Sequence, residues 1–235
     1  MFVSAWAGLG HADNDHSSTL KHLEILTGGA LASEPLPLVI ALHGYGDTPE
    51  NFSDLWRHYP KAARIVLLQA PKTKGRGFSW FTIVRPIDFS HHPVSHEIMN
   101  VSVDIVRTVR HLMATRPTIG RPIVTGFSQG GILSLTLALH YPDVFAAAVP
   151  IAGTVPIRFR AVDTQPAPVY AFHGTADRVV TLASLQRSQV AFSEGGRPIQ
   201  LKTYRDVQHW MTPDMRRDVY TRVGALIDNE MSTEQ

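Results

Sequence analysis

The 235-residue chain contains no cysteine. This absence excludes disulfide bonds, thiolate metal sites and a cysteine nucleophile together. Charge is also scarce: charged residues make up 18% of the chain, and the formal net charge is +2 with histidine neutral. The basic residues are spread along the chain rather than clustered, so we expect no nucleic-acid partner.

Long apolar runs are missing too. The longest uninterrupted ones, such as residues 38–42, fall far short of the ~20 residues that a membrane-spanning helix needs. The N-terminus, MFVSAWAGLGHADNDH, lacks the basic start and long apolar centre of a secretory signal peptide. We therefore expect a cytoplasmic protein with no membrane span.

Short apolar runs alternate with segments of helical period. The runs typical of buried strands are residues 36–42, 64–68, 122–125, 146–151 and 168–172. A further run, 199–204, alternates apolar and polar residues and is expected nearer a sheet edge, and residues 20–26 are the best candidate for a leading antiparallel strand.

Four segments are typical of helices: residues 97–114, 130–140, 181–192 and 213–227. Thr181 is placed to cap the third of them. The alternation predicts an α/β fold, with a doubly wound, mainly parallel sheet covered by helices on both faces. We expect a single domain over residues 1–235, in which residues 1–30 are poorly assigned.

The stretch from Pro71 to Pro93 fits neither a strand nor a helix period. It carries Trp80 and Phe81 where a loop would ordinarily be polar. Because long loops in compact domains are commonly functional, we expect this one to lie over a pocket.

Ser128 lies in Gly126-Phe127-Ser128-Gln129-Gly130, between a predicted strand and a predicted buried helix. The Gly-x-Ser-x-Gly pattern is that of a nucleophile elbow, in which the serine hydroxyl stands exposed on a strained turn. The alternative is a glycine-rich turn with an idle serine. Ligands of open α/β sheets bind beyond the carboxyl ends of the strands, which favours the first interpretation.

A serine nucleophile needs a base that a third group orients, in the chain order Ser, Asp or Glu, His. Asp177 directly follows the strand predicted at 168–172, whereas the rival acids Asp143 and Asp163 lie after a helix end and in a polar link. His209 follows the last predicted strand and is the only histidine beyond His173, which we expect to hold the strand end.

The oxyanion that forms on an attacked carbonyl requires preorganised hydrogen-bond donors. The residue after the nucleophile supplies one backbone N–H, here Gln129, and a loop after an earlier strand supplies the other. That loop is Leu42-His43-Gly44-Tyr45-Gly46-Asp47, and we expect the Tyr45 amide to be the second donor.

These segments resemble the phospholipase/carboxylesterase group of α/β-hydrolases, which includes the acyl-protein thioesterases. The matching pieces follow the family's order: LHGYGD at 42–47, QAP at 69–71, GRGFSWF at 75–81, GFSQGG at 126–131, HGTADRVV at 173–180 and QHW at 208–210. The resemblance implies a hydrolase domain without a large lid, which cleaves carboxylic esters or thioesters through a serine acyl-enzyme without a cofactor. It carries Ser128, Asp177 and His209 over to the catalytic triad, and Tyr45 and Gln129 to the oxyanion hole.

The chain departs from the family at three places. Tyr45 replaces a common leucine, and Thr82 replaces an aspartate. Val207-Gln208 stands where the family commonly has Gly-Gly or similarly small residues before the histidine. These changes leave the triad intact and bear on the acyl pocket. The residues expected to shape or narrow that pocket are Tyr45, Trp80, Phe81, Val179 and Trp210.

The leading hypothesis is a serine esterase for small to medium acyl chains. A thioesterase or lysophospholipase shares the same chemistry and differs only in its leaving-group pocket. Two alternatives of other classes are an idle α/β-hydrolase used as a scaffold, and metal binding by His91, His92 and His96, whose spacing is loose. We expect no metal; acyl-chain length, leaving group and oligomeric state stay open.

Overall fold

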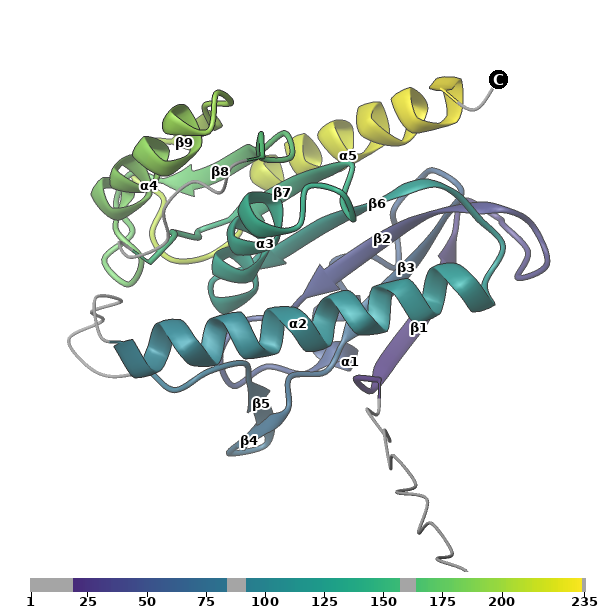
Figure 1. Cartoon of the computed structure of the whole chain (residues 1–235), viewed down its shortest axis with the longest axis horizontal. Helices are drawn as coiled ribbons and strands as arrows, with labels where there is room; N and C mark the ends of the chain where they lie inside the picture. Colours follow the sequence, from purple (N-terminus) through teal and green to yellow (C-terminus); the bar gives the residue numbers. More distant parts are fainter. Residues whose placement is uncertain (1–18, 84–91, 157–163, 234–235) are drawn as a thin grey trace, which may run out of the picture.

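A computed structural model describes residues 19–83, 92–156 and 164–233. Its central sheet has seven strands in the order β1-β3-β2-β6-β7-β8-β9 (Figure 1). Their bounds are β1 His22–Thr27, β2 Leu36–Leu42, β3 Ala63–Leu68, β6 Thr118–Phe127, β7 Ala147–Ile151, β8 Tyr170–Gly174 and β9 Gln200–Tyr204. Only β1 runs antiparallel to its neighbour, so the predicted mainly parallel sheet with a leading antiparallel strand is confirmed.

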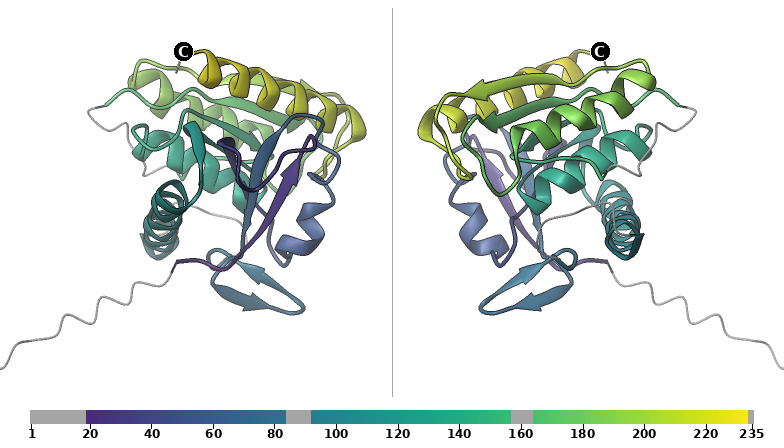
Figure 2. Two further views of the ribbon diagram at one scale, coloured as in Figure 1. Left: turned by 90° about the vertical axis from the view of Figure 1, so that its right-hand side faces the viewer. Right: turned by 90° about the vertical axis from the view of Figure 1, so that its left-hand side faces the viewer.

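Helices cover both faces of this sheet (Figure 2). The helices are α1 Pro49–Ser53, α2 His92–Thr115, α3 Gln129–His140, α4 Leu182–Glu194 and α5 Pro213–Thr233. Helices α2, α3 and α4 contribute to one hydrophobic core, and α1 and α5 contribute to the other. The doubly wound arrangement is therefore confirmed.

Strand β2 shows why such a sheet requires apolar residues on both faces. All its residues are buried, with Leu38, Ile40 and Leu42 in one core and Val39 and Ala41 in the other. Successive side chains of a strand point to opposite faces, so a continuous apolar run feeds both cores. At the sheet edge, β9 is largely exposed, in agreement with its alternating sequence.

The expectation that residues 71–93 form one irregular loop is wrong in part. Residues Lys72–Lys74 and Gly77–Ser79 pair as the short antiparallel strands β4 and β5, and helix α2 already begins at His92. Residues 84–91 lie outside the described part of the chain. The hairpin is anchored by hydrogen bonds that Phe78 forms with the backbone of Gly46 and Asp47, at distances of 2.8 and 2.9 Å.

Parallel topology brings the carboxyl ends of β2, β6, β8 and β9 to one edge of the sheet. The Gly44–Asp47 loop, Ser128, Asp177 and His209 follow these four strands in turn. The predicted candidate residues are thus brought to the same place by strand order alone.

Among the helices of the described residues, none is long and apolar enough to cross a membrane.

Candidate active site

Ser128 occupies a sharp turn between β6 and α3. Its backbone has φ 56° and ψ −110°, in a region that non-glycine residues rarely adopt. The Ser128 N–H donates to the carbonyl of Ile151 on β7 at 3.0 Å, which fixes the turn to the sheet. Strained backbone of this kind persists only where the surrounding structure holds it, and it gathers at functional sites.

Gly126 and Gly130 are required by close packing around this turn. A Cβ atom on Gly130 would lie 1.9 Å from the carbonyl oxygen of Leu42, and one on Gly126 would lie 2.6 Å from the carbonyl carbon of Gly130. Side chains at either position would collide with backbone, which cannot move aside without displacing β2. The two glycines therefore allow α3 to start directly against the end of β2.

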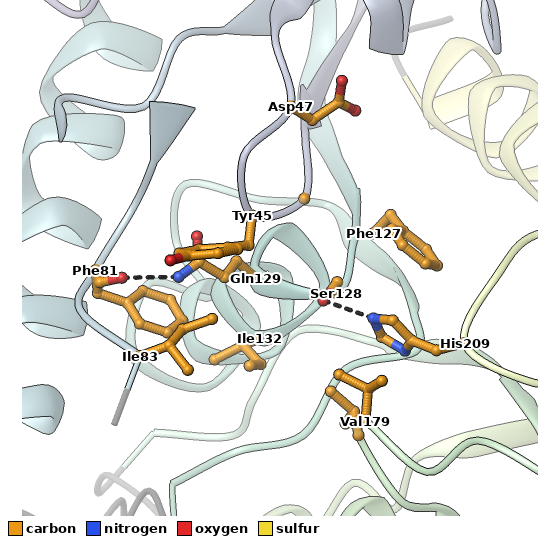
Figure 3. Close-up of a pocket in the computed structure, with 12 residues that line it drawn as sticks. Tyr45, Asp47, Phe81, Ile83, Phe127, Ser128, Gln129, Ile132, Val179 and His209 are labelled. Atoms are coloured by element: carbon orange, nitrogen blue, oxygen red, sulfur yellow. Dashed lines mark hydrogen bonds between the residues drawn. The ribbon is translucent and has the colours of Figure 1, made fainter. Parts of the chain in front are cut away.

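Ser128, His209 and Asp177 form one hydrogen-bonded chain (Figure 3). The His209 Nδ1 lies 2.7 Å from Oδ2 of Asp177, and its Nε2 lies 2.8 Å from Oγ of Ser128. An ionised carboxylate only accepts hydrogen bonds, so Nδ1 carries the proton and Nε2 is left to accept from the serine hydroxyl. The three predicted triad residues are in contact in the order that serine activation requires.

The Asp177 carboxylate is held on both of its oxygens. Its Oδ1 accepts from the backbone N–H groups of Val179 and Val180, at 2.8 and 2.9 Å. Burial alone would raise the pKa of Asp177, but the hydrogen bond and charge of His209, together with these two amides, lower it overall. The group therefore stays an anion and keeps the imidazole in one orientation.

His173 supports the turn that carries Asp177. Its Nε2 lies 2.7 Å from the Val180 carbonyl, which can only accept, so Nε2 is the protonated nitrogen. Burial lowers the pKa of His173, and its Nδ1 has no partner among the described residues, both of which favour the neutral ring. His173, which is expected to hold the strand end, bonds to the turn that follows β8.

The described rival acid, Asp143, pairs with an arginine rather than with His209. Asp143 is exposed and pairs with Arg110 at 3.2 Å. Asp163 lies outside the described residues. Of the two described candidates, Asp177 is the one that the structure brings to the histidine.

The loop after β2 faces the nucleophile. A Cβ atom on Gly44 would lie 3.7 Å from Cβ of Ser128, which shows how closely the loop backbone approaches. Buried His43 fixes this loop from behind, because its Nδ1 donates to the Gly44 carbonyl at 2.7 Å and its Nε2 accepts from the Ala70 N–H at 3.2 Å. Sequence reasoning assigned no role to His43, although it stands at a strand end beside two glycines.

The expected oxyanion donors, Tyr45 and Gln129, both line the cavity at Ser128. Gln129 is the first residue of α3, and the first N–H groups of a helix have no partner within it. The Tyr45 N–H donates to no backbone acceptor among the described residues. Both amides are therefore available to a developing negative charge, which the helix dipole of α3 also favours.

The side chain of Gln129 has a separate structural role. Its Oε1 accepts from the Trp80 N–H at 3.0 Å and from Oγ of Ser79 at 3.3 Å, and its Nε2 donates to the Phe81 carbonyl at 2.8 Å. Nothing in the local sequence pattern indicated these contacts, since the position reads only as the spacer of the Gly-x-Ser-x-Gly pattern.

A cavity of about 380 Å³ opens over Ser128. Of the expected pocket residues, Tyr45, Phe81 and Val179 line it. The prediction that Trp80 and Trp210 also shape the pocket is wrong, because neither residue lines the cavity. Trp80 is buried and donates its Nε1–H to the His43 carbonyl at 2.9 Å, and Trp210 is 58% exposed to solvent.

Three apolar lining residues were missed: Ile83, Phe127 and Ile132. Ile132 lies one helical turn beyond Ser128, so helix spacing could have indicated it. Ile83 follows Phe81 in a stretch outside any strand, where spacing gives no such signal. Phe127 packs its ring beside the His209 imidazole, with 4.9 Å between centroids (Figure 3).

Most of the histidines of the hypothetical metal site lie outside the part of the chain whose side chains are described. His91 is not described, nor is the side chain of His92. Within residues 19–83, 92–156 and 164–233, no group of three or more histidine, cysteine, aspartate or glutamate side chains could hold a metal ion.

The phospholipase/carboxylesterase family model matches residues 29–227. The chain belongs to the phospholipase/carboxylesterase family. This match, together with the mainly parallel sheet, confirms the predicted α/β-hydrolase fold.

The chain is similar to acyl-protein thioesterase 1 of Mycosarcoma maydis, with 26% identity over 216 residues, covering 79% of this chain and 89% of that protein. It is 30% identical to NocK of Nocardia uniformis subsp. tsuyamanensis over 155 residues, covering 64% of this chain and only 42% of NocK. The fold of the crystal structure of esterase PE8 is similar, with a TM-score of 0.75, 20% identity, and coverage of 89% of this chain and 100% of PE8.

Proposed function

We propose that this enzyme of the esterase/thioesterase family is a serine hydrolase that cleaves carboxylic esters of small to medium acyl chain through an acyl-enzyme. The observation that carries the proposal is the single imidazole of His209, which lies 2.8 Å from the Ser128 hydroxyl and 2.7 Å from the Asp177 carboxylate. Family membership supports the same class of reaction.

In the first half of the proposed reaction, Oγ of Ser128 attacks the ester carbonyl and its proton passes to Nε2 of His209. Asp177 stabilises the imidazolium that forms. The carbonyl oxygen becomes an oxyanion, to which the Tyr45 and Gln129 amides donate. The intermediate then collapses: the bond to the leaving oxygen breaks, and that oxygen takes the proton from Nε2.

In the second half, water attacks the acyl-Ser128 ester and gives a proton to the now neutral His209. The second tetrahedral intermediate expels Oγ, which recovers the proton, and the carboxylic acid leaves. Every proton passes through one nitrogen, Nε2, so no cofactor is required for the balance of atoms and charge.

A thioester substrate is the alternative. The name of the similar Mycosarcoma maydis protein, an acyl-protein thioesterase, supports it. The acylation chemistry is the same, and only the leaving atom, sulfur in place of oxygen, differs.

The test is a panel of p-nitrophenyl esters and matched thioesters of graded acyl length, with wild type and Ser128→Ala compared. We expect wild type to turn over the shorter esters faster than the matched thioesters, and Ser128→Ala to lose at least about 10³-fold in kcat, in line with loss of a serine nucleophile. A Ser128→Ala variant with the wild-type rate would overturn the mechanism. Faster cleavage of thioesters than of esters would favour the alternative.

The catalytically idle scaffold is tested separately with a fluorophosphonate probe. The reagent should label Ser128 in wild type and leave Ser128→Ala unlabelled. A folded wild-type protein that neither reacts with the probe nor cleaves any ester would favour the scaffold.

A further inference from the structure

The side-chain amide of Gln129 is almost fully buried, with 1% of the residue exposed. It bonds to three consecutive residues that begin with the last residue of β5: Ser79, Trp80 and Phe81. A buried amide that satisfies backbone groups of a neighbouring segment is difficult to replace, because each lost partner leaves a buried polar group unpaired. The position of residues 79–81 is therefore tied to the residue after the nucleophile.

The same segment is held at its far end. The Thr82 N–H donates to Oε2 of Glu97 on α2 at 2.6 Å, and the Thr82 hydroxyl lies 3.1 Å from Oε1. Phe81 thus stands between two anchors, Gln129 on α3 and Glu97 on α2. Its ring is buried and forms part of the cavity wall.

The cavity has two sides relative to Ser128 (Figure 3). On one side lie His209, Phe127 and Val179; on the other lie Phe81, Ile83 and Ile132. If His209 protonates the leaving group, the leaving group must lie on the histidine side. The acyl chain is then directed toward Phe81, Ile83 and Ile132, which we call the acyl wall.

We propose that the Gln129 side chain is a specificity-determining group: by fixing Phe81, it sets the acyl wall and thereby the preference for acyl length. The inference rests on the proposed ester hydrolysis. The acyl wall carries no charge. Asp47 is the one acidic residue among the described residues that line the cavity, and it directs its carboxylate away from Ser128 in Figure 3. The substrate class is therefore an ester with an uncharged, apolar acyl chain.

The experiment compares kcat/KM for p-nitrophenyl octanoate and p-nitrophenyl acetate in wild type and Gln129→Met. Methionine has a similar length and volume but forms none of the three hydrogen bonds, and the backbone N–H at position 129 is retained. We expect the octanoate-to-acetate ratio to fall about tenfold, mainly through KM for octanoate, because the longer chain loses an ordered wall. Gln186→Met, an exposed position on α4, is the matched control and should keep the wild-type ratio.

An unchanged ratio in Gln129→Met, with both esters slowed equally, overturns the inference, since a purely structural or oxyanion defect affects both substrates alike. If this variant does not fold, Ser79→Ala decides. Its hydroxyl bonds to the Phe81 carbonyl at 2.8 Å and to Gln129, so its loss should lower the ratio about threefold. An unchanged ratio in Ser79→Ala would then overturn the inference.

If the proposed ester hydrolysis itself is wrong, the same experiment gives a different result. Wild type would then cleave neither acetate nor octanoate esters, nor the matched thioesters. Active wild type with an unchanged ratio in the variants overturns only the role of the Gln129 side chain.

Discussion

The strained backbone at Ser128 predicts that a glycine at this position gives a more stable fold than an alanine does. Ser128 has φ 56° and ψ −110°, which places its Cβ in an unfavourable position. Ser128→Ala and Ser128→Gly both remove the hydroxyl and its hydrogen bond with His209. The two variants differ only in whether a Cβ atom is present, so their comparison isolates the backbone strain.

The size of the stability difference between Ser128→Gly and Ser128→Ala follows from two opposing effects. Holding a non-glycine residue in a sparsely populated region costs ~1–3 kcal/mol. Glycine in turn makes the unfolded chain more flexible, which lowers stability by about 0.4–1 kcal/mol relative to alanine. We therefore expect Ser128→Gly to be about 1 kcal/mol more stable than Ser128→Ala, or roughly 2–4 °C in Tm for a chain of this size.

Urea unfolding followed by tryptophan fluorescence, together with thermal melts, measures this difference. Both variants should be inactive toward esters, so activity serves as the control that the nucleophile is gone. If Ser128→Ala were as stable as Ser128→Gly or more so, the turn would not be strained in the free enzyme, and the reasoning would fail.

Further predictions concern the supports of the nucleophile. Asp177→Asn should lower kcat about 10⁴-fold, because an amide can present its N–H to Nδ1 and leave the proton of His209 on the wrong nitrogen; a loss below tenfold in steady-state assays would argue against an orienting role. The lowered pKa of Asp177 means that ionised Asp177 stabilises the fold above the unfolded value of about 3.9, and this contribution is lost as pH falls through the folded pKa. Urea titrations at neutral pH and below pH 4 should therefore show the stability gap between wild type and Asp177→Asn shrinking with acidity, whereas a constant gap would contradict the assignment. Gly130→Ala should destabilise the fold by about 3 kcal/mol, since the added methyl meets the Leu42 carbonyl; a melt within 2 °C of wild type, by roughly the same scaling, would show that the turn can relax.

The triad could be predicted because parallel strands end at a common edge. Ser128, Asp177 and His209 each follow a predicted strand. The parallel topology therefore brings them together, and this result does not depend on the conformation of the intervening loops. Chain order then selects among the remaining acids and histidines. The same reasoning located the Tyr45 loop, because it follows β2, the strand beside β6.

Short elements were not predictable in this way. Strands β4 and β5 have only three residues each, β4 is exposed throughout, and their pairing is reinforced by backbone bonds from Phe78 to a loop distant in sequence. Helix α1 spans five residues, too few for a helical period, although Thr48 and Pro49 form a recognisable cap and first position.

The pocket was predicted in part because local sequence does not fix the direction in which loop side chains point. Phe81 faces the cavity, whereas its neighbour Trp80 turns inward, where its indole N–H bonds to the His43 carbonyl. Trp210 adjoins His209 in sequence but points to solvent. These orientations depend on bonds between segments that are far apart in the chain.

The most direct test of the central claim is to trap the acyl-enzyme. Wild type would be mixed with p-nitrophenyl butyrate, quenched in acid during the first turnovers, digested and analysed by mass spectrometry. The account predicts a butyryl increment on the peptide that contains Ser128, together with a burst of p-nitrophenol of equal stoichiometry, and neither signal in Ser128→Ala. Steady turnover of the ester by a Ser128→Ala enzyme, or a butyryl group found on another residue in place of Ser128, would contradict it.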